Sequence, residues 1–182
     1  MWGYIIIAVV VILLLWVLLT YNSLVNLNNR VKEAFSTMDV YLKKRWDLIP
    51  NIVETVKGYA KHEKETLEEV VNFRNSSYDK MSTNDKVDVN SKLSSRITKL
   101  MALAEAYPEL KANENFQDLS NQLTKVEEDI ANSRKYYNGT VRNFNNKVEM
   151  FPSNIVASLL GYKTKKMFEA SNNERESINI NL

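Results

Sequence analysis

The segment WGYIIIAVVVILLLWVLLTY, residues 2–21, decides how this 182-residue chain is built. It contains no charged side chain, and the first charged side chain in the sequence is that of Arg30. About 20 apolar residues in an α-helix span the ~30 Å hydrocarbon layer of a bilayer, where a helix satisfies its own backbone hydrogen bonds. The sequence therefore predicts a single N-terminal membrane helix.

Two other interpretations of this segment are a cleaved signal peptide and a buried soluble helix. A signal peptide has a basic start, an apolar run of about 7–15 residues and a cleavage site of small residues. This N-terminus has no Lys or Arg, and Thr20-Tyr21-Asn22-Ser23 is a poor cleavage site. A soluble helix rarely lacks a polar face over such a length. We therefore expect an uncleaved anchor.

Aromatic residues mark both ends of the expected anchor. Amphipathic rings favour the headgroup region, which suits Trp2, Tyr4 and Tyr21. Trp16 lies further inside and is expected to pack against lipid or a neighbouring helix. Arg30 and Lys32 follow the anchor, and positive charge prefers the cytoplasmic side. We expect a short N-terminus outside the cell and a cytoplasmic C-terminal body.

The composition of the remaining 161 residues favours one helical domain. They hold all 24 Lys and Arg and all 22 Asp and Glu, and the net charge of +2 gives no reason to expect nucleic-acid binding. The absence of Cys excludes disulfides and cysteine–zinc sites. With only four Gly and three Pro, the chain has few residues that break long helices.

The hydrophobic periodicity predicts an all-α fold: a single transmembrane helix, then an antiparallel four-helix bundle with long helices and a short C-terminal helix. The first helix continues to about Arg45, with a bend possible at residues 22–29. A second begins at Asp47-Leu48-Ile49-Pro50, with Asp47 as cap and Pro50 in its first turn. A third covers about 86–106, where Tyr107-Pro108 ends it. Ser153 is expected to cap the short helix 154–160.

The fourth helix has the most regular pattern, a coiled-coil-type seam that could be filled within the chain or between chains. It steps by three and four residues through Phe116, Leu119, Leu123, Val126, Ile130, Tyr137, Val141, Phe144 and Val148. The predicted organisation is thus an anchor at 1–21, a helical bundle at 22–168 and a flexible tail at 169–182.

Catalytic chemistry is poorly represented in this sequence. His62 is the only histidine, Lys61-His62-Glu63 is not a zinc spacing, and no P-loop or GxGxxG motif occurs. We expect no catalytic residue, no metal and no cofactor. His62 is expected to be a structural or helix-face residue.

Two sets of charged residues are candidates for a role beyond solvation. We expect an ion network between helices at the edge of the bundle, formed by Arg45, Asp47, Glu63, Arg74, Glu127 and Arg134. The alternative is a set of solvated charges, worth ~0–1 kcal/mol per exposed pair. The second set, Lys163, Lys165 and Lys166, contains candidate contacts for anionic lipid, or else stays in water while the short helix caps the bundle.

The chain also resembles the LemA family over nearly its whole length, to about Phe168. The order and spacing of several short segments carry the resemblance: Tyr21-Asn22-Ser23-Leu24-Val25, Lys44-Arg45-Trp46-Asp47-Leu48-Ile49-Pro50-Asn51, Gly58-Tyr59-Ala60-Lys61-His62-Glu63, Tyr107-Pro108-Glu109-Leu110-Lys111-Ala112, Asn115-Phe116, Arg134-Lys135-Tyr136-Tyr137-Asn138, Phe144-Asn145 and Phe151-Pro152-Ser153-Asn154. Two positions depart from the family pattern, Ser120 where Gln is usual and Val126 where Thr is usual.

This resemblance implies a bacterial single-pass membrane protein with a cytoplasmic helical body and a poorly defined biochemical role. It supplies no catalytic residues. It also implies a link to membrane metalloproteases and, for some relatives, to magnetosome membranes.

Three functions remain in competition. The first is a non-enzymatic membrane-anchored scaffold or adaptor that forms homo-oligomers or docks onto another membrane protein. The second is a lipid-binding or membrane-shaping protein that acts through the amphipathic, basic C-terminal segment. The third is an enzyme or protease-dependent factor with His62 as acid or base.

Overall fold

The computed structural model describes residues 1–60, 62–73 and 78–168, and these residues are almost entirely helical. They form α1 (Trp2–Tyr59), α2 (Lys64–Phe73), the 3-10 turn η1 (Tyr78–Lys80), α3 (Thr83–Glu105), α4 (Pro108–Lys111), α5 (Glu114–Glu149) and α6 (Ser153–Leu159). No strand occurs among them. The all-α prediction is confirmed, and the expected tail at 169–182 lies outside the described residues.

The described chain divides into two compact units, and both α1 and α5 contribute to each of them. One unit holds residues 1–37 and 135–167, which include α6. The other holds residues 38–134 and Phe168, which include α2, α3 and α4.

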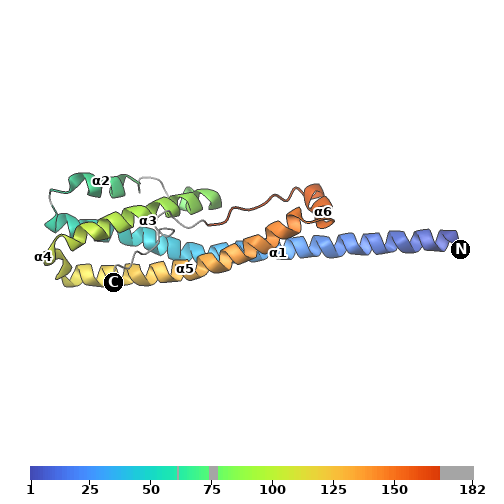
Figure 1. Ribbon diagram of the computed structural model, residues 1–182, viewed down its shortest axis with the longest axis horizontal. Helices are drawn as coiled ribbons and strands as arrows, with labels where there is room; N and C mark the ends of the chain where they lie inside the picture. The colour runs from blue at the N-terminus through green and yellow to red at the C-terminus, as the bar shows by residue number, and fades with distance from the viewer. Residues whose placement is uncertain (61, 74–77, 169–182) are drawn as a thin grey trace, which may run out of the picture. The chain divides into compact units, whose positions relative to one another are not determined.

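The unit built on residues 38–134 is the helical bundle. Its four main helices are the second half of α1, then α2, α3 and the first half of α5, and each reverses the direction of the one before (Figure 1). Its apolar core is fully or almost fully buried and includes Met38, Leu42, Ile52, Val56, Val70, Leu93, Leu100, Val126 and Ile130. The seam predicted for the fourth helix supplies much of the α5 contribution.

The unit built on residues 1–37 and 135–167 packs α6 and the end of α5 against α1. Leu24, Val156 and Ala157 form its buried cluster, against which Trp16 and Tyr162 pack. The Tyr162 ring meets Phe144 edge to face, with ring centres 5.7 Å apart. The hydroxyl of Tyr137 donates to the carbonyl of Lys166 over 3.1 Å, which ties the segment after α6 back to α5.

The predicted helix start at Asp47 is wrong, because α1 runs without a break from Trp2 to Tyr59. Pro50 lies inside the helix and has no backbone N–H to donate, and a proline in a helix interior costs ~3 kcal/mol or more. Ile52, Val53 and Val56 follow at 0–5% exposure, and burying each such side chain gains about 1.5–3 kcal/mol. Burial on both sides of Pro50 outweighs the lost hydrogen bond, so the helix continues.

One predicted helix start and one predicted helix cap also differ from the structure. The third helix begins three residues early, at Thr83, because Ser82 and Asp85 form a capping box in which each side chain accepts a backbone N–H of the other. Ser153 does not cap α6. Its hydroxyl instead donates to the carbonyls of Lys147 and Met150, which fastens α6 to the end of α5.

Candidate functional site

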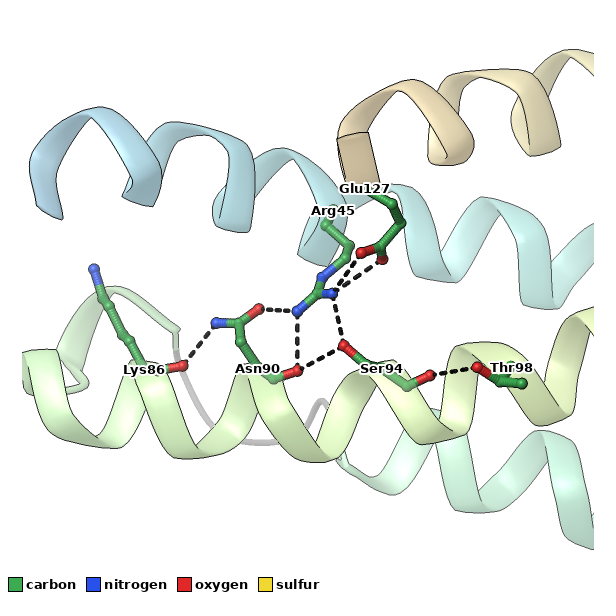
Figure 2. Close-up of polar contacts among 6 residues, drawn as sticks. All are labelled: Arg45, Lys86, Asn90, Ser94, Thr98 and Glu127. Atoms are coloured by element: carbon green, nitrogen blue, oxygen red, sulfur yellow. Dashed lines mark hydrogen bonds and ion pairs between the residues drawn. The ribbon is translucent and has the colours of Figure 1, made fainter. Parts of the chain in front are cut away.

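The most unusual feature of the bundle is a charged side chain in its core. Arg45 lies on α1 with 0% of its surface exposed, in a bundle whose buried residues are mostly apolar. An unpaired buried charge is very unfavourable, so the groups that pair with Arg45 contribute directly to the stability of the bundle. Figure 2 shows that these partners come from α3 and α5.

Both terminal nitrogens of the Arg45 guanidinium are fully engaged. Nη1 donates to Glu127 Oε1 and Oε2 at 3.0 and 3.1 Å and to Ser94 Oγ at 3.0 Å. Nη2 donates to the carbonyl and the side-chain oxygen of Asn90 at 3.0 and 2.7 Å. Hydrogen bonds to a charged group contribute about 1.5–3 kcal/mol each. The guanidinium therefore joins α1, α3 and α5 through five contacts.

Asn90 is the second buried polar residue of this site, with 0% of its surface exposed. Its amide nitrogen donates to the carbonyl of Lys86 over 2.8 Å, which turns its oxygen towards Arg45 (Figure 2). One residue thus presents two acceptors, its backbone carbonyl and its side-chain oxygen, to the same guanidinium nitrogen. Leu in its place would supply only the first.

A second polar cluster adjoins the first. Asp39 on α1 accepts hydrogen bonds from Lys86 Nζ at 2.6 Å and from the Tyr78 hydroxyl at 2.7 Å. The Lys86 amine also lies 4.6 Å from the centre of the Tyr78 ring, and that ring packs against Trp46 with centres 5.4 Å apart. The cluster holds the turn η1 against α1 and α3.

Burial controls the acidity of Tyr78, which is 3% exposed. Burial raises the pKa of its phenol far above the ordinary value, and the hydrogen bond to the Asp39 carboxylate raises it further. The phenol is therefore a permanent hydrogen-bond donor in the folded protein.

These arrangements support a structural role more readily than a chemical one. The guanidinium is enclosed and its terminal N–H groups are occupied, so it has little left to offer a ligand. Of the charged groups in the two clusters, Glu127 is the most exposed, with 36% of its side chain accessible, whereas the side chain of Asp39 is 27% and that of Lys86 13% exposed. Within the described ranges, no group of three or more His, Asp or Glu side chains could hold a metal ion.

The six charged residues expected to form one ion network are not all together in the structure. Arg45 and Glu127 pair directly. Asp47 pairs with Lys43 at the surface, one helical turn away, and Glu63 is within 3.5 Å of the Tyr107 hydroxyl. Arg134 lies over the Phe168 ring at 5.3 Å, and Arg74 lies outside the described residues. His62 lies exposed in the turn after α1.

Several residues of the site were not singled out from the sequence: Asp39, Tyr78, Lys86, Asn90 and Ser94. One of them left a signal. Asn90 falls in register with Leu93 and Ile97, three and seven residues later, so a polar side chain occupies the buried stripe of α3. Such a residue requires a buried polar partner, although only the fold identifies that partner as Arg45.

The expected anchor and lysine residues are also located. Trp2, Tyr4 and Tyr21 are exposed. Trp16 is half-buried and packs against the cluster formed by Leu24, Val156 and Ala157. Lys163 and Lys166 are exposed. The Lys165 amine lies 5.3 Å from the centre of the Phe144 ring, and burial, together with the charge of Lys32, lowers its pKa.

Comparison with known proteins gives one family. The model of the LemA family matches residues 34–182. The chain is similar to Protein LemA of Metamycoplasma hominis, with 29% identity over 161 residues that cover 86% of this chain and 72% of that protein. It is also similar to magnetosome proteins MamQ 1 and MamQ 2 of Paramagnetospirillum magneticum, each 28% identical over 71 residues, which are 39% of this chain and 26% of those proteins.

Replacing the acidic partner of Arg45 tests the buried contact. We expect Glu127→Ala to lower the free energy of unfolding by about 2 kcal/mol, because Arg45 keeps Asn90 and Ser94 but loses its counter-charge. Glu128→Ala, at the next and exposed position, should change it by less than about 0.5 kcal/mol. Urea unfolding of the detergent-solubilised protein gives both values. Equal effects of the two substitutions would mean that the pair contributes no more than a surface contact.

The raised pKa of Tyr78 predicts a loss of stability at alkaline pH. The unfolded phenol ionises above pH ~10, whereas the folded one stays neutral. The contribution of Tyr78 to the free energy of unfolding is therefore fully present below pH ~10, and above that pH it declines by up to about 1.4 kcal/mol per pH unit. Tyr78→Phe should remove this part of the pH dependence. Unfolding free energies of both proteins at pH 8 and pH 11 measure it, and parallel declines would contradict the prediction.

Proposed function

Because the chain belongs to the LemA family, we propose that it is a non-enzymatic, membrane-anchored helical adaptor. Its α1 helix crosses the membrane once, and its bundle contacts a second copy or another membrane protein. The short N-terminus lies outside, and the bundle lies in the cytoplasm.

One observation carries this proposal. Apart from the half-buried Trp16, the large apolar side chains between Ile5 and Leu19 are 40–70% exposed on α1, over a stretch long and apolar enough to cross a membrane. Soluble monomers rarely expose continuous apolar surface of this extent. Lipid is the environment in which such a surface is stable, and helical backbone needs no other hydrogen-bond partner there.

The polar residues of the bundle support binding over catalysis. Arg45, Asp39 and Lys86 are held in contacts that join helices, and His62 lies exposed in a turn. A bundle fixed in this way offers helix faces to a partner. Tethering to a membrane raises the effective concentration of such faces, so weak contacts are enough for assembly.

Two exposed apolar side chains on the bundle are suitable positions at which to test for contact with a partner. Val40 on α1 is 66% exposed and Val71 on α2 is 47% exposed. Neither belongs to the apolar stretch that precedes Thr20, so both lie outside the part of α1 proposed to contact lipid. We take these two positions as reporters of protein contact.

Site-specific photo-crosslinking tests the adaptor role. A photoreactive amino acid at Val40 or Val71 of the full-length protein should give adducts in cells, either with a second copy or with another membrane protein, because these side chains face outward. The same amino acid at Glu128, an exposed charged position, is the control. The adaptor role would be contradicted if Val40 and Val71 gave no adducts above those of Glu128 and the protein in mild detergent were strictly monomeric.

A further inference from the structure

Helix α6 and the turn before it present their larger apolar side chains outward. Ile155 is 52% exposed, Leu159 83% and Leu160 42%, and in the turn Met150 is 62% and Phe151 79% exposed. The face of α6 that packs inward carries the smaller residues Val156 and Ala157. We call the five exposed residues the apolar rim. A helix in water normally has the opposite arrangement.

The position of α6 along α1 relates the rim to the apolar stretch. Val156 and Ala157 pack with Leu24, and Trp16 packs against the same cluster. Thr20, midway between Trp16 and Leu24 on the same helix face, is also buried. Figure 1 shows α6 beside α1 here. Because α1 rises 1.5 Å per residue, this contact extends from about 7.5 Å before Tyr21 to about 4.5 Å after it.

That range coincides with the boundary between hydrocarbon and headgroups. If residues 2–21 cross the ~30 Å core, Tyr21 lies at its edge, and each headgroup layer adds about 5–8 Å. A helix attached at this level cannot avoid the interface. Amphipathic interfacial helices bury their apolar faces about 5–10 Å into this same boundary.

A groove beside α6 combines apolar and polar groups in the way that suits a lipid headgroup. It measures about 320 Å³, and its lining includes Trp16, Phe151, Lys147 and the amides of Asn143 and Asn146. Aromatic rings, a cation and amide donors together are typical of residues at the membrane interface.

Lys165 is poorly placed to make the lipid contact instead. Its backbone N–H donates to Asn145 Oδ1 at 2.8 Å, its carbonyl accepts from Asn145 Nδ2 at 2.9 Å, and its amine lies over Phe144. This lysine belongs to the packing against α5.

We propose that the apolar rim inserts into the membrane interface as a second lipid contact, so that α6 holds the protein against the leaflet at which α1 leaves the bilayer. The inference rests on the anchoring proposed above. The occupant of the rim is lipid, because its helix is attached to α1 at the level of the interface.

The absence of Cys allows a direct test with single labels on the full-length protein. Nitroxide labels at Ile155→Cys and Leu159→Cys are measured in vesicles of phosphatidylcholine and phosphatidylglycerol by their accessibility to oxygen and to a water-soluble nickel chelate. Both positions are exposed, so neither label disturbs the packing of α6. Leu13→Cys is the reference for the anchor and Glu128→Cys the reference for water.

The labels at Ile155→Cys and Leu159→Cys should be several-fold less accessible to the nickel chelate than the label at Glu128→Cys, and they should be accessible to oxygen. Their depth in the bilayer should be smaller than that of the label at Leu13→Cys. Nickel accessibility equal to that of Glu128→Cys, with Leu13→Cys deep, would overturn the inference and leave the anchoring intact. Rim labels shielded from both reagents would indicate a protein partner and would also overturn it. If Leu13→Cys were accessible to nickel, the anchoring itself would fail and the inference with it.

Discussion

The buried guanidinium of Arg45 is the constraint on which the bundle depends. A charge with no exposed surface must be matched inside the protein, and here one carboxylate, one amide, one hydroxyl and one carbonyl match it. These groups come from α3 and α5, so the contact requires one longitudinal register between three helices. Apolar stripes alone specify register less well, because a stripe shifted by one heptad still meets another stripe. Removing one partner of a buried ion pair destabilises a protein far more than replacing the whole pair by apolar residues.

The pattern of the sequence predicted the parts of the fold that depend on local periodicity. The apolar stretch of α1, the seam of α5 and the end of α3 before Pro108 follow from the spacing of a few residue types. The interruption expected at Asp47 and Pro50 does not occur, since a proline in isolation favours a helix start while burial of Ile49, Ile52 and Val56 favours continuation. Helix propensity is a property of single residues, and at Pro50 the burial of neighbouring side chains outweighed the low helix propensity of proline.

The candidate site was harder to predict for a related reason. The pairing of Arg45 with Glu127 joins residues 82 positions apart, and no local spacing relates them. Asp47, by contrast, pairs with a residue close to it in sequence. Lys43 lies one helical turn before it and forms an ion pair with its carboxylate at the surface. Asn90 was not singled out from the sequence, although it is a polar residue in the apolar stripe of α3. The fold alone determined how these residues were paired.

Helix α1 gives these features a common basis, because the same helix contains the apolar stretch and the buried arginine. Hydrogen exchange of the full-length protein in lipid nanodiscs tests this continuity most directly. We predict amide protection in α1 across residues 22–29 and from residue 46 to residue 55, comparable to that of the α5 seam. Rapid exchange at either place, with protected amides on both sides, would mean that the helix is broken there and would contradict the account.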